Sequence, residues 1–363
     1  MSTVEYEVYT DANFIGEMGH GDYQLLLWDI GVHRPGQTRL LCLRVKEEEP
    51  SLFFVPPPKA HALICLASLF LRRRLILGST SRFDDKPVRT LFLADHPPNI
   101  TFDLEPRSHR YVDEDIVRGP DTKLGELSQW LTLVDNLNTA AREKFISSAK
   151  LYAQAVELIE VRPDVSYLNL VSAIETLAKD INIGEPTLND LRPGLQDLVN
   201  KISDLELQQK IVQKLAKEGF LGRKFSEFIK QHIEKDDSFW NYARRPDKCS
   251  RVTPESLDRL LKNIYGKRSR ALHSGERFPD YIFIPLGTIP WIGDYPEDTF
   301  LNKKIIVHHE SVEEIPTGTS ITSGGMTWKS RDFIPYPHFF ERLVNHVLKN
   351  YLKSLQVIGG SQE

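Results

Sequence analysis

The feature that most limits what this chain can fold into is a long run of helical periodicity over residues 123–161. Apolar residues recur there at intervals of three and four, the pattern of an amphipathic helix. Arg162-Pro163-Asp164 interrupts the run, and the sequence predicts a second helix over 165–181. Further helices are predicted over 193–217, 222–236, 254–273 and 336–355. Short breaks between long amphipathic segments indicate a helical bundle with antiparallel neighbours.

Residues 1–120 have a different pattern, with short apolar runs bounded by glycine, proline and polar residues. Such runs are typical of strands in a packed sheet. We expect strands over 23–32, 38–45, 88–95 and 99–106 and one helix over 59–74. The predicted fold class is α+β, with a strand-rich α+β domain over 1–120 and a helical domain over 121–363. Within the helical domain, we expect short strands and exposed loops over 278–330, before the C-terminal helix.

Composition sets broad limits on the class of protein. The 363 residues are 40% hydrophobic, enough for two cores, and the net charge of −4 means that any nucleic-acid contact needs a local basic surface. Three widely spaced cysteines (Cys42, Cys65, Cys249) argue against a disulfide framework and favour a reducing cytoplasm. The most apolar run reaches Arg72 after about a dozen residues, whereas a bilayer span needs about 20. We therefore expect a cytoplasmic protein without membrane contact.

No cofactor or metal site is expected from the sequence. His308-His309-Glu310 does not have the HExxH spacing, and no second group of histidines or carboxylates stands near it. The GxxxxGK[ST] phosphate-binding pattern and the GxSxG nucleophile pattern are both absent from the sequence. These absences disfavour metal-dependent hydrolysis, P-loop chemistry and serine-hydrolase chemistry.

The helix predicted over 254–273, with Thr253 as its N-cap, carries an unusual pair of residues. Its apolar stripe consists of Leu257, Leu260, Leu261, Ile264, Ala271 and Leu272. Arg268 falls near the centre of this stripe, so its guanidinium must be paired, line a cleft or face a second subunit, because an unpaired buried cation is strongly unfavourable. His273 lies in the last turn, about 140° from Arg268 around a regular helix. Both side chains reach one reacting group only if the helix ends early or two copies meet about a two-fold axis.

The stretch YGKRSRALHSG, residues 265–275, resembles the Arg-Ser-x-x-x-His motif of HEPN-domain proteins, particularly the ApeA-like branch. The earlier helix SYLNLVSAIETLA, residues 166–178, has a similar Ala-x-Glu-x-Leu pattern, so the resemblance covers roughly residues 125–275. One departure is Ser274, which stands where the family has a glycine straight after the histidine. The resemblance implies a HEPN-type helical bundle that works as a homodimer.

The resemblance also implies a metal-independent endoribonuclease with RNA as its partner. The RNA 2′-hydroxyl attacks the adjacent phosphate and leaves a 2′,3′-cyclic phosphate and a 5′-hydroxyl. In such a reaction His273 serves as base or acid, and Arg268 stabilises the charge that develops on the phosphate. Ser269 orients His273 or a phosphate, and Glu175 is a candidate partner for Arg268 or for the imidazole.

Basic residues gather around this motif. Residues 223–270 contain 13 lysines and arginines against 7 aspartates and glutamates, in a chain whose net charge is −4. The candidate RNA contacts are Lys267, Arg270, Arg244, Arg245, Lys248 and Tyr265, with Trp240 and Tyr242 as further stacking surfaces. The local charge therefore agrees with RNA as the partner.

Each of these features also has a structural interpretation. Arg268 and Glu175 can form an ion pair in the core, His273 can cap a helix end, and the basic run can be a solvated face. At the level of function, the alternative is a non-catalytic HEPN module that dimerises and binds RNA or a protein. A third hypothesis is a regulator such as an antitoxin partner. The nuclease hypothesis implies a toxin-like effector of anti-phage defence or stress response. Its N-terminal domain would then bind a regulatory protein or ligand.

Overall fold

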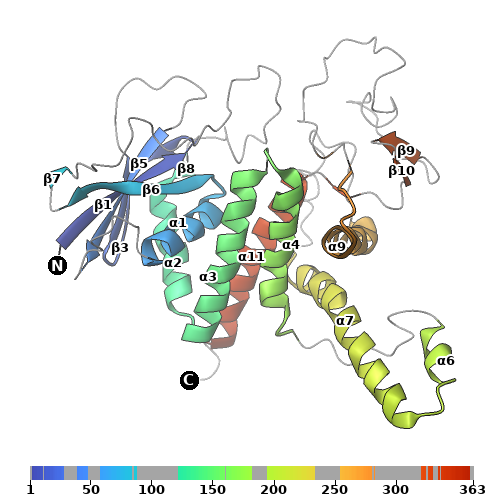
Figure 1. Ribbon diagram of the computed structural model, residues 1–363. Coiled ribbons are helices and arrows are strands. Elements are labelled where there is room, and N and C mark those ends of the chain that lie inside the picture. Colours follow the sequence, from blue (N-terminus) through green and yellow to red (C-terminus); the bar gives the residue numbers. More distant parts are fainter. Residues whose placement is uncertain are drawn as a thin grey trace, which may run out of the picture.

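The computed structural model describes residues 2–10, 12–27, 39–47, 58–83, 86–87, 122–159, 161–181, 194–233, 254–279, 282, 320–323, 326–329, 334–335 and 337–359. The strands predicted over 88–95 and 99–106, and most of segment 278–330, lie outside these residues. A strand-rich N-terminal region with an antiparallel sheet precedes a mostly helical remainder (Figure 1). The α+β class predicted from the sequence is confirmed at this level.

The N-terminal region is built on a six-stranded antiparallel sheet with strand order β3-β4-β5-β1-β6-β7. The strands are β1 (Ser2–Thr10), β3 (Met18–His20), β4 (Tyr23–Leu27), β5 (Arg39–Glu47), β6 (Leu75–Phe83) and β7 (Lys86–Pro87). Val4, Tyr6 and Val8 alternate along β1 and join the hydrophobic core, as the period of two in a strand requires. β4 and β5 coincide with predicted strands, whereas the sequence patterns do not predict β1 and β6.

One helix of the N-terminal region connects the sheet to the bundle. The helix predicted over 59–74 is α1 (Pro58–Leu71), which packs against β6 and against α3 (Thr139–Leu158). A short parallel pairing of β2 (Phe14–Ile15) with β8 (Thr122–Lys123) then brings the chain back to this region before the helices begin.

The helical run over 123–161 is divided into two helices, α2 (Leu127–Asp135) and α3. The side-chain oxygen of Asn138 accepts a hydrogen bond from the Ala141 backbone N–H at 2.9 Å and caps the start of α3. The periodic pattern alone does not predict this break, because apolar spacing continues on both sides of the cap.

The remaining helices follow the predicted segments with two differences. They are α4 (Pro163–Ala178), α6 (Leu195–Val199), α7 (Leu205–His232), α9 (Leu257–Ser274) and α11 (Pro337–Gly359), and a hairpin of β9 (Ser320–Ser323) and β10 (Met326–Lys329) precedes α11. The helix predicted over 193–217 is interrupted between Val199 and Leu205, and α7 then runs as one helix of 28 residues although the sequence predicts a break between 217 and 222. Across the described ranges, no helix is long and apolar enough to span a membrane.

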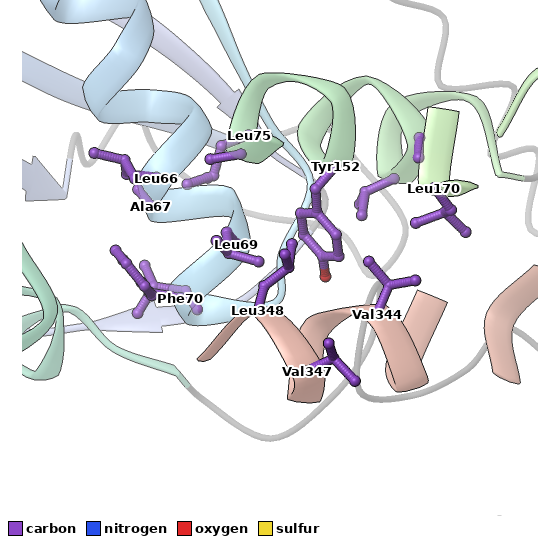
Figure 2. Packing of buried hydrophobic residues seen from close by; sticks show 14 of the residues in the cluster. Leu66, Ala67, Leu69, Phe70, Leu75, Tyr152, Leu170, Val344, Val347 and Leu348 are labelled. Carbon is purple, nitrogen blue, oxygen red and sulfur yellow. The ribbon is translucent and has the colours of Figure 1, made fainter. Parts of the chain in front are cut away.

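One hydrophobic cluster extends from the sheet through α1 into α3, α4 and α11. Figure 2 shows Leu69 of α1 beside Leu348 of α11 and Tyr152 of α3, with Val344 of α11 on the side of Leu170 of α4. The core is therefore continuous across residue 120 in the described chain. The division into two domains stays a prediction from the sequence.

A buried ion pair also joins the N-terminal region to the bundle. Arg72, directly after α1, has a left-handed backbone with φ of 52° and places its guanidinium on the carboxylate of Glu341 in α11. The shortest contact, from Nη2 to Oε2, is 2.6 Å, and Glu341 is fully buried. The Tyr152 hydroxyl donates a hydrogen bond to the same carboxylate. We call this cluster, Arg72, Glu341, Tyr152 and Asn345, the junction network.

Candidate active site

The candidate active site is centred on α9, which ends as the sequence predicts and begins slightly later. Residues Pro254–Ser256 form a 3₁₀ turn, and the α-helix starts at Leu257. The predicted N-cap, Thr253, lies outside the described residues. At the other end, Gly275 is left-handed with φ of 64°, and its N–H donates to the Arg270 carbonyl. The helix continues through Ser274, so it does not end before His273.

The inward face of α9 differs from the predicted apolar stripe in its last two turns. Leu257, Leu260, Leu261 and Ile264 are buried, as predicted. Leu272 is 53% exposed and does not belong to this face, which corrects the prediction. In these turns Ala271 is partly buried, and the side chain of Lys267 is 2% exposed and lies on the inward face.

Arg268 reaches across to α4 and pairs with Glu175. Its Nη2 lies 2.7 Å from Oε2 of Glu175, and the two side chains are 19% and 13% exposed. Arg268 Nε and Glu175 Oε1 are buried without a hydrogen-bond partner among the described residues. The pair is therefore mostly hidden and only partly hydrogen-bonded.

Tyr265 lies beside this pair. The Arg268 guanidinium carbon is 5.7 Å from the centre of the Tyr265 ring, and the Phe225 ring is 5.5 Å away. A methyl group added to Gly222 of α7 would lie 2.8 Å from the same ring, so the glycine allows this close approach. Burial raises the pKa of Tyr265 to about 12, and the charge of Glu175 adds to the increase. Tyr265 is only partly buried beside Arg268 and Phe225, and its predicted role as a base-stacking contact stays a prediction.

Lys267 is also not the RNA contact that the sequence predicts. The residue is 2% exposed, and its ammonium lies 2.6 Å from Oε1 of Glu276. It also donates to the Arg277 carbonyl and lies 5.8 Å from the centre of the Phe278 ring. The prediction is wrong because spacing around a helix shows which residues share a face but not what packs against that face.

His273 and Ser269 lie on the outer side of α9. His273 is exposed, Ser269 is partly exposed, and neither forms a hydrogen bond with another side chain in the described parts of the chain. His273 therefore presents its imidazole to solvent while Arg268 points inward to α4. Within one copy, the structure brings Arg268, Glu175 and Tyr265 together and does not bring His273 to them.

Other predicted contacts have mixed outcomes. Arg270 is half-exposed and its Nε donates to Oε2 of Glu276 at 2.8 Å. Arg244, Arg245, Lys248, Trp240 and Tyr242 lie outside the described residues. Two exposed cations that sequence reasoning missed, Arg259 and Lys262, lie on α9. The spacing of seven and eleven residues from Lys262 to Ser269 and His273 was the signal that could have found it.

No group of three or more histidine, cysteine, aspartate or glutamate side chains within the described ranges is arranged to hold a metal ion. On α9 and α4 the structure provides a guanidinium, paired with the Glu175 carboxylate, and an exposed imidazole at His273. Comparison with known proteins adds no identification, since no family model, curated protein or solved structure matches the chain.

Proposed function

We propose that the chain is a metal-independent endoribonuclease of HEPN type that acts as a homodimer. The observation that carries this proposal is the end of α9, where an arginine oriented by Glu175 and an exposed histidine, His273, lie five residues apart. The resemblance of residues 265–275 to the HEPN motif supports the same assignment. Because α9 continues through Ser274, the two side chains diverge within one copy, and a second copy is needed to bring a histidine to each arginine.

The residue types suit cleavage of RNA by its own 2′-hydroxyl. An imidazole removes the hydroxyl proton as that oxygen bonds to phosphorus, and an imidazolium protonates the departing 5′-oxygen. His273 from each of two copies divides these roles. Arg268 remains charged throughout, and its guanidinium offers N–H donors to the phosphate oxygens as charge builds on them. The products are a 2′,3′-cyclic phosphate and a 5′-hydroxyl.

Exposed cations on the same helix supply a binding surface for the RNA backbone. Arg259 and Lys262 are exposed, and Arg270 is half-exposed beside the motif. Phosphate contacts of this kind position a nucleic acid without reading its sequence and weaken as salt rises. In the cell, such an activity fits a cytoplasmic effector of anti-phage defence or stress response, with the N-terminal region as its regulatory part.

The test is cleavage of a 5′-labelled single-stranded RNA by the full chain in EDTA. We expect fragments ending in 2′,3′-cyclic phosphate, and loss of cleavage in Arg268→Lys and His273→Ala while folding is retained. His20→Ala is the control, since His20 lies on β3, bonded to Asp135 and remote in sequence from α9. Intact RNA with folded wild-type chain, or full activity in His273→Ala, contradicts the proposal.

A second candidate function is a HEPN module that binds without cleaving. It is favoured by the pairing and 19% exposure of Arg268, which are properties of a structural ion pair. RNA retention in a gel-shift assay without cleavage, lost in a Lys262→Ala and Arg259→Ala double variant, supports this second function and not the first.

A further inference from the structure

Lys267 is the starting point, because an almost completely buried lysine needs a specific reason. Ammonium groups are rarely buried unless they are paired, since leaving water is costly for a charge. Burial lowers the pKa of Lys267, and Glu276 opposes this effect. The partners of the ammonium, Glu276 and the Arg277 carbonyl, both lie just beyond the end of α9.

Glu276 holds two cations of α9 at once. Its Oε1 accepts from Lys267 at 2.6 Å, and its Oε2 accepts from Arg270 at 2.8 Å. Burial alone would raise the pKa of this carboxyl, but the two cations lower it below its usual value. Each carboxylate oxygen of Glu276 therefore accepts a hydrogen bond from a cation of α9, nine residues earlier for Lys267 and six residues earlier for Arg270.

Backbone hydrogen bonds also join the segment after α9 to its last turn. The N–H groups of Gly275 and Glu276 both donate to the carbonyl of Arg270, the second at 3.3 Å. The left-handed Gly275 turns the chain back on the helix, and Lys267 and Arg270 then hold the returning segment. His273 lies inside the stretch that these contacts close.

We propose that Lys267 and Glu276 are positioning residues that keep the last turn of α9 helical and so hold the exposed His273 in place. The inference rests on the proposed function for its catalytic consequence, and on the geometry alone for its effect on the turn. Helix ends otherwise fray, because their last carbonyls lack partners within the helix. Neither residue touches the RNA in this scheme.

Two other roles for Lys267 and Glu276, a surface salt bridge and a contribution to general stability, do not explain their position. An ordinary surface salt bridge leaves both groups in solvent and contributes little. Here the ammonium is buried, and its two oxygen partners belong to one short segment next to His273. A role confined to general stability would not single out the last turn.

The test compares Glu276→Gln with Arg277→Ala in the full chain. Arg277→Ala removes an exposed side chain but keeps the carbonyl that accepts from Lys267, so it is a matched control in the same segment. Amide hydrogen exchange of residues 271–275 is measured by NMR, with α4 amides as an internal reference. In Glu276→Gln we expect exchange over 271–275 to be faster by about tenfold or more, with α4 unchanged, and no change in the control.

The second readout is RNA cleavage. In Glu276→Gln we expect kcat to fall about 10- to 100-fold, a range typical of losing a group that orients a functional side chain, while KM stays within about twofold. Lys267→Met should show the same division between kcat and KM. If Lys267→Met fails to fold, Glu276→Gln alone decides, since Glu276 is partly exposed.

The two proposals fail in different ways. Unchanged exchange over 271–275 in Glu276→Gln overturns the positioning role, whether or not the chain cleaves RNA. Unchanged kcat in a variant with faster exchange also overturns it, because the turn would then be irrelevant to His273. A wild-type chain without RNA cleavage but with the expected exchange change overturns the ribonuclease and leaves the effect on the turn established.

Discussion

Among the described residues, two clusters each combine an arginine, a glutamate and a tyrosine, and they differ in how completely their arginine and glutamate are bonded. In the junction network, Arg72 contacts both oxygens of the fully buried Glu341. Around α9, Arg268 contacts a single oxygen of Glu175. The tyrosines do not differ in this way, since Tyr152 donates to Glu341 and, besides burial, a hydrogen bond with Glu175 contributes to the raised pKa of Tyr265.

The junction network is closed by a fourth residue. Asn345 of α11 donates to the Tyr152 hydroxyl at 3.0 Å and to the Leu69 carbonyl at 2.7 Å. The tyrosine lies deep in the core between α1 and α11 (Figure 2). A buried network with its groups satisfied favours one arrangement of the elements that it joins.

The α9 cluster is left partly unsatisfied. Arg268 Nε and Glu175 Oε1 are buried and have no hydrogen-bond partner in the described structure. Buried polar atoms without hydrogen-bond partners are rare in native proteins, and a functional role is one reason for keeping them. The comparison is consistent with a first cluster that holds the fold together, and it agrees with the proposal that the second belongs to a functional site.

The largest effect is expected from breaking the junction network. Glu341→Leu leaves the Arg72 guanidinium, which is mostly covered, without its carboxylate, and should lower the free energy of unfolding by about 3–5 kcal/mol in urea denaturation. The double variant Arg72→Met with Glu341→Leu should recover much of this loss. Arg162→Ala, which removes an exposed pair with Asp164, is the control and should change stability little. Equal losses in Glu341→Leu and Arg162→Ala would show that the network has no special role.

A smaller loss is expected at the α9 cluster. Glu175→Gln removes one charged contact from a pair that keeps some access to solvent, so unfolding should become easier by about 1–3 kcal/mol. RNA cleavage should fall far more than stability, because Arg268 loses the group that orients it. A variant that unfolds as easily as Glu341→Leu but retains full cleavage would reverse the assignment of the two clusters.

The next effect is a pH dependence at Lys349 of α11, whose pKa responds to the charge of Arg72 in the junction network. Burial, and then the charges of Arg72, Lys353 and Arg73, lower the pKa of Lys349 from 10.5 to about 8. Between pH 8 and 10.5 the unfolded chain therefore binds more protons at this residue, and stability from this group rises with pH. Lys349→Met should be more stable than wild type at neutral pH, and the difference should shrink over that window in urea titrations. A constant difference at all these pH values contradicts the assigned shift.

The smallest expected effect is the pH dependence of stability at Tyr265, where stability falls as pH rises instead of increasing as it does at Lys349. Its pKa rises from 10.0 to about 12 on folding, so the unfolded phenol ionises first and its contribution to stability is lost as pH rises across that range. Tyr265→Phe should reduce the slope of stability against pH between 10 and 12, measured as a difference from wild type. Identical slopes would place the phenol in solvent rather than beside Glu175.

The sequence patterns predicted local features of α9 and of the N-terminal region, but they did not predict most contacts between residues far apart in the chain. Arg268 and His273 were found because they share one helix, and Glu175 was proposed from its own helical pattern. Lys267 was misassigned because Glu276 folds back over it only after Gly275 turns the chain. The junction network had no signal, since Arg72 and Glu341 are 269 residues apart and belong to elements with ordinary patterns.

The sequence by itself determined the α+β class, most helix positions and the C-terminal end of α9, because apolar period and terminal glycines act over a few neighbouring residues. Only the tertiary structure decided that Arg268 meets Glu175, 93 residues away, that Lys267 is buried and that His273 is exposed. The physical reason is that burial and charge pairing depend on which elements pack together, and that choice is made by the whole core.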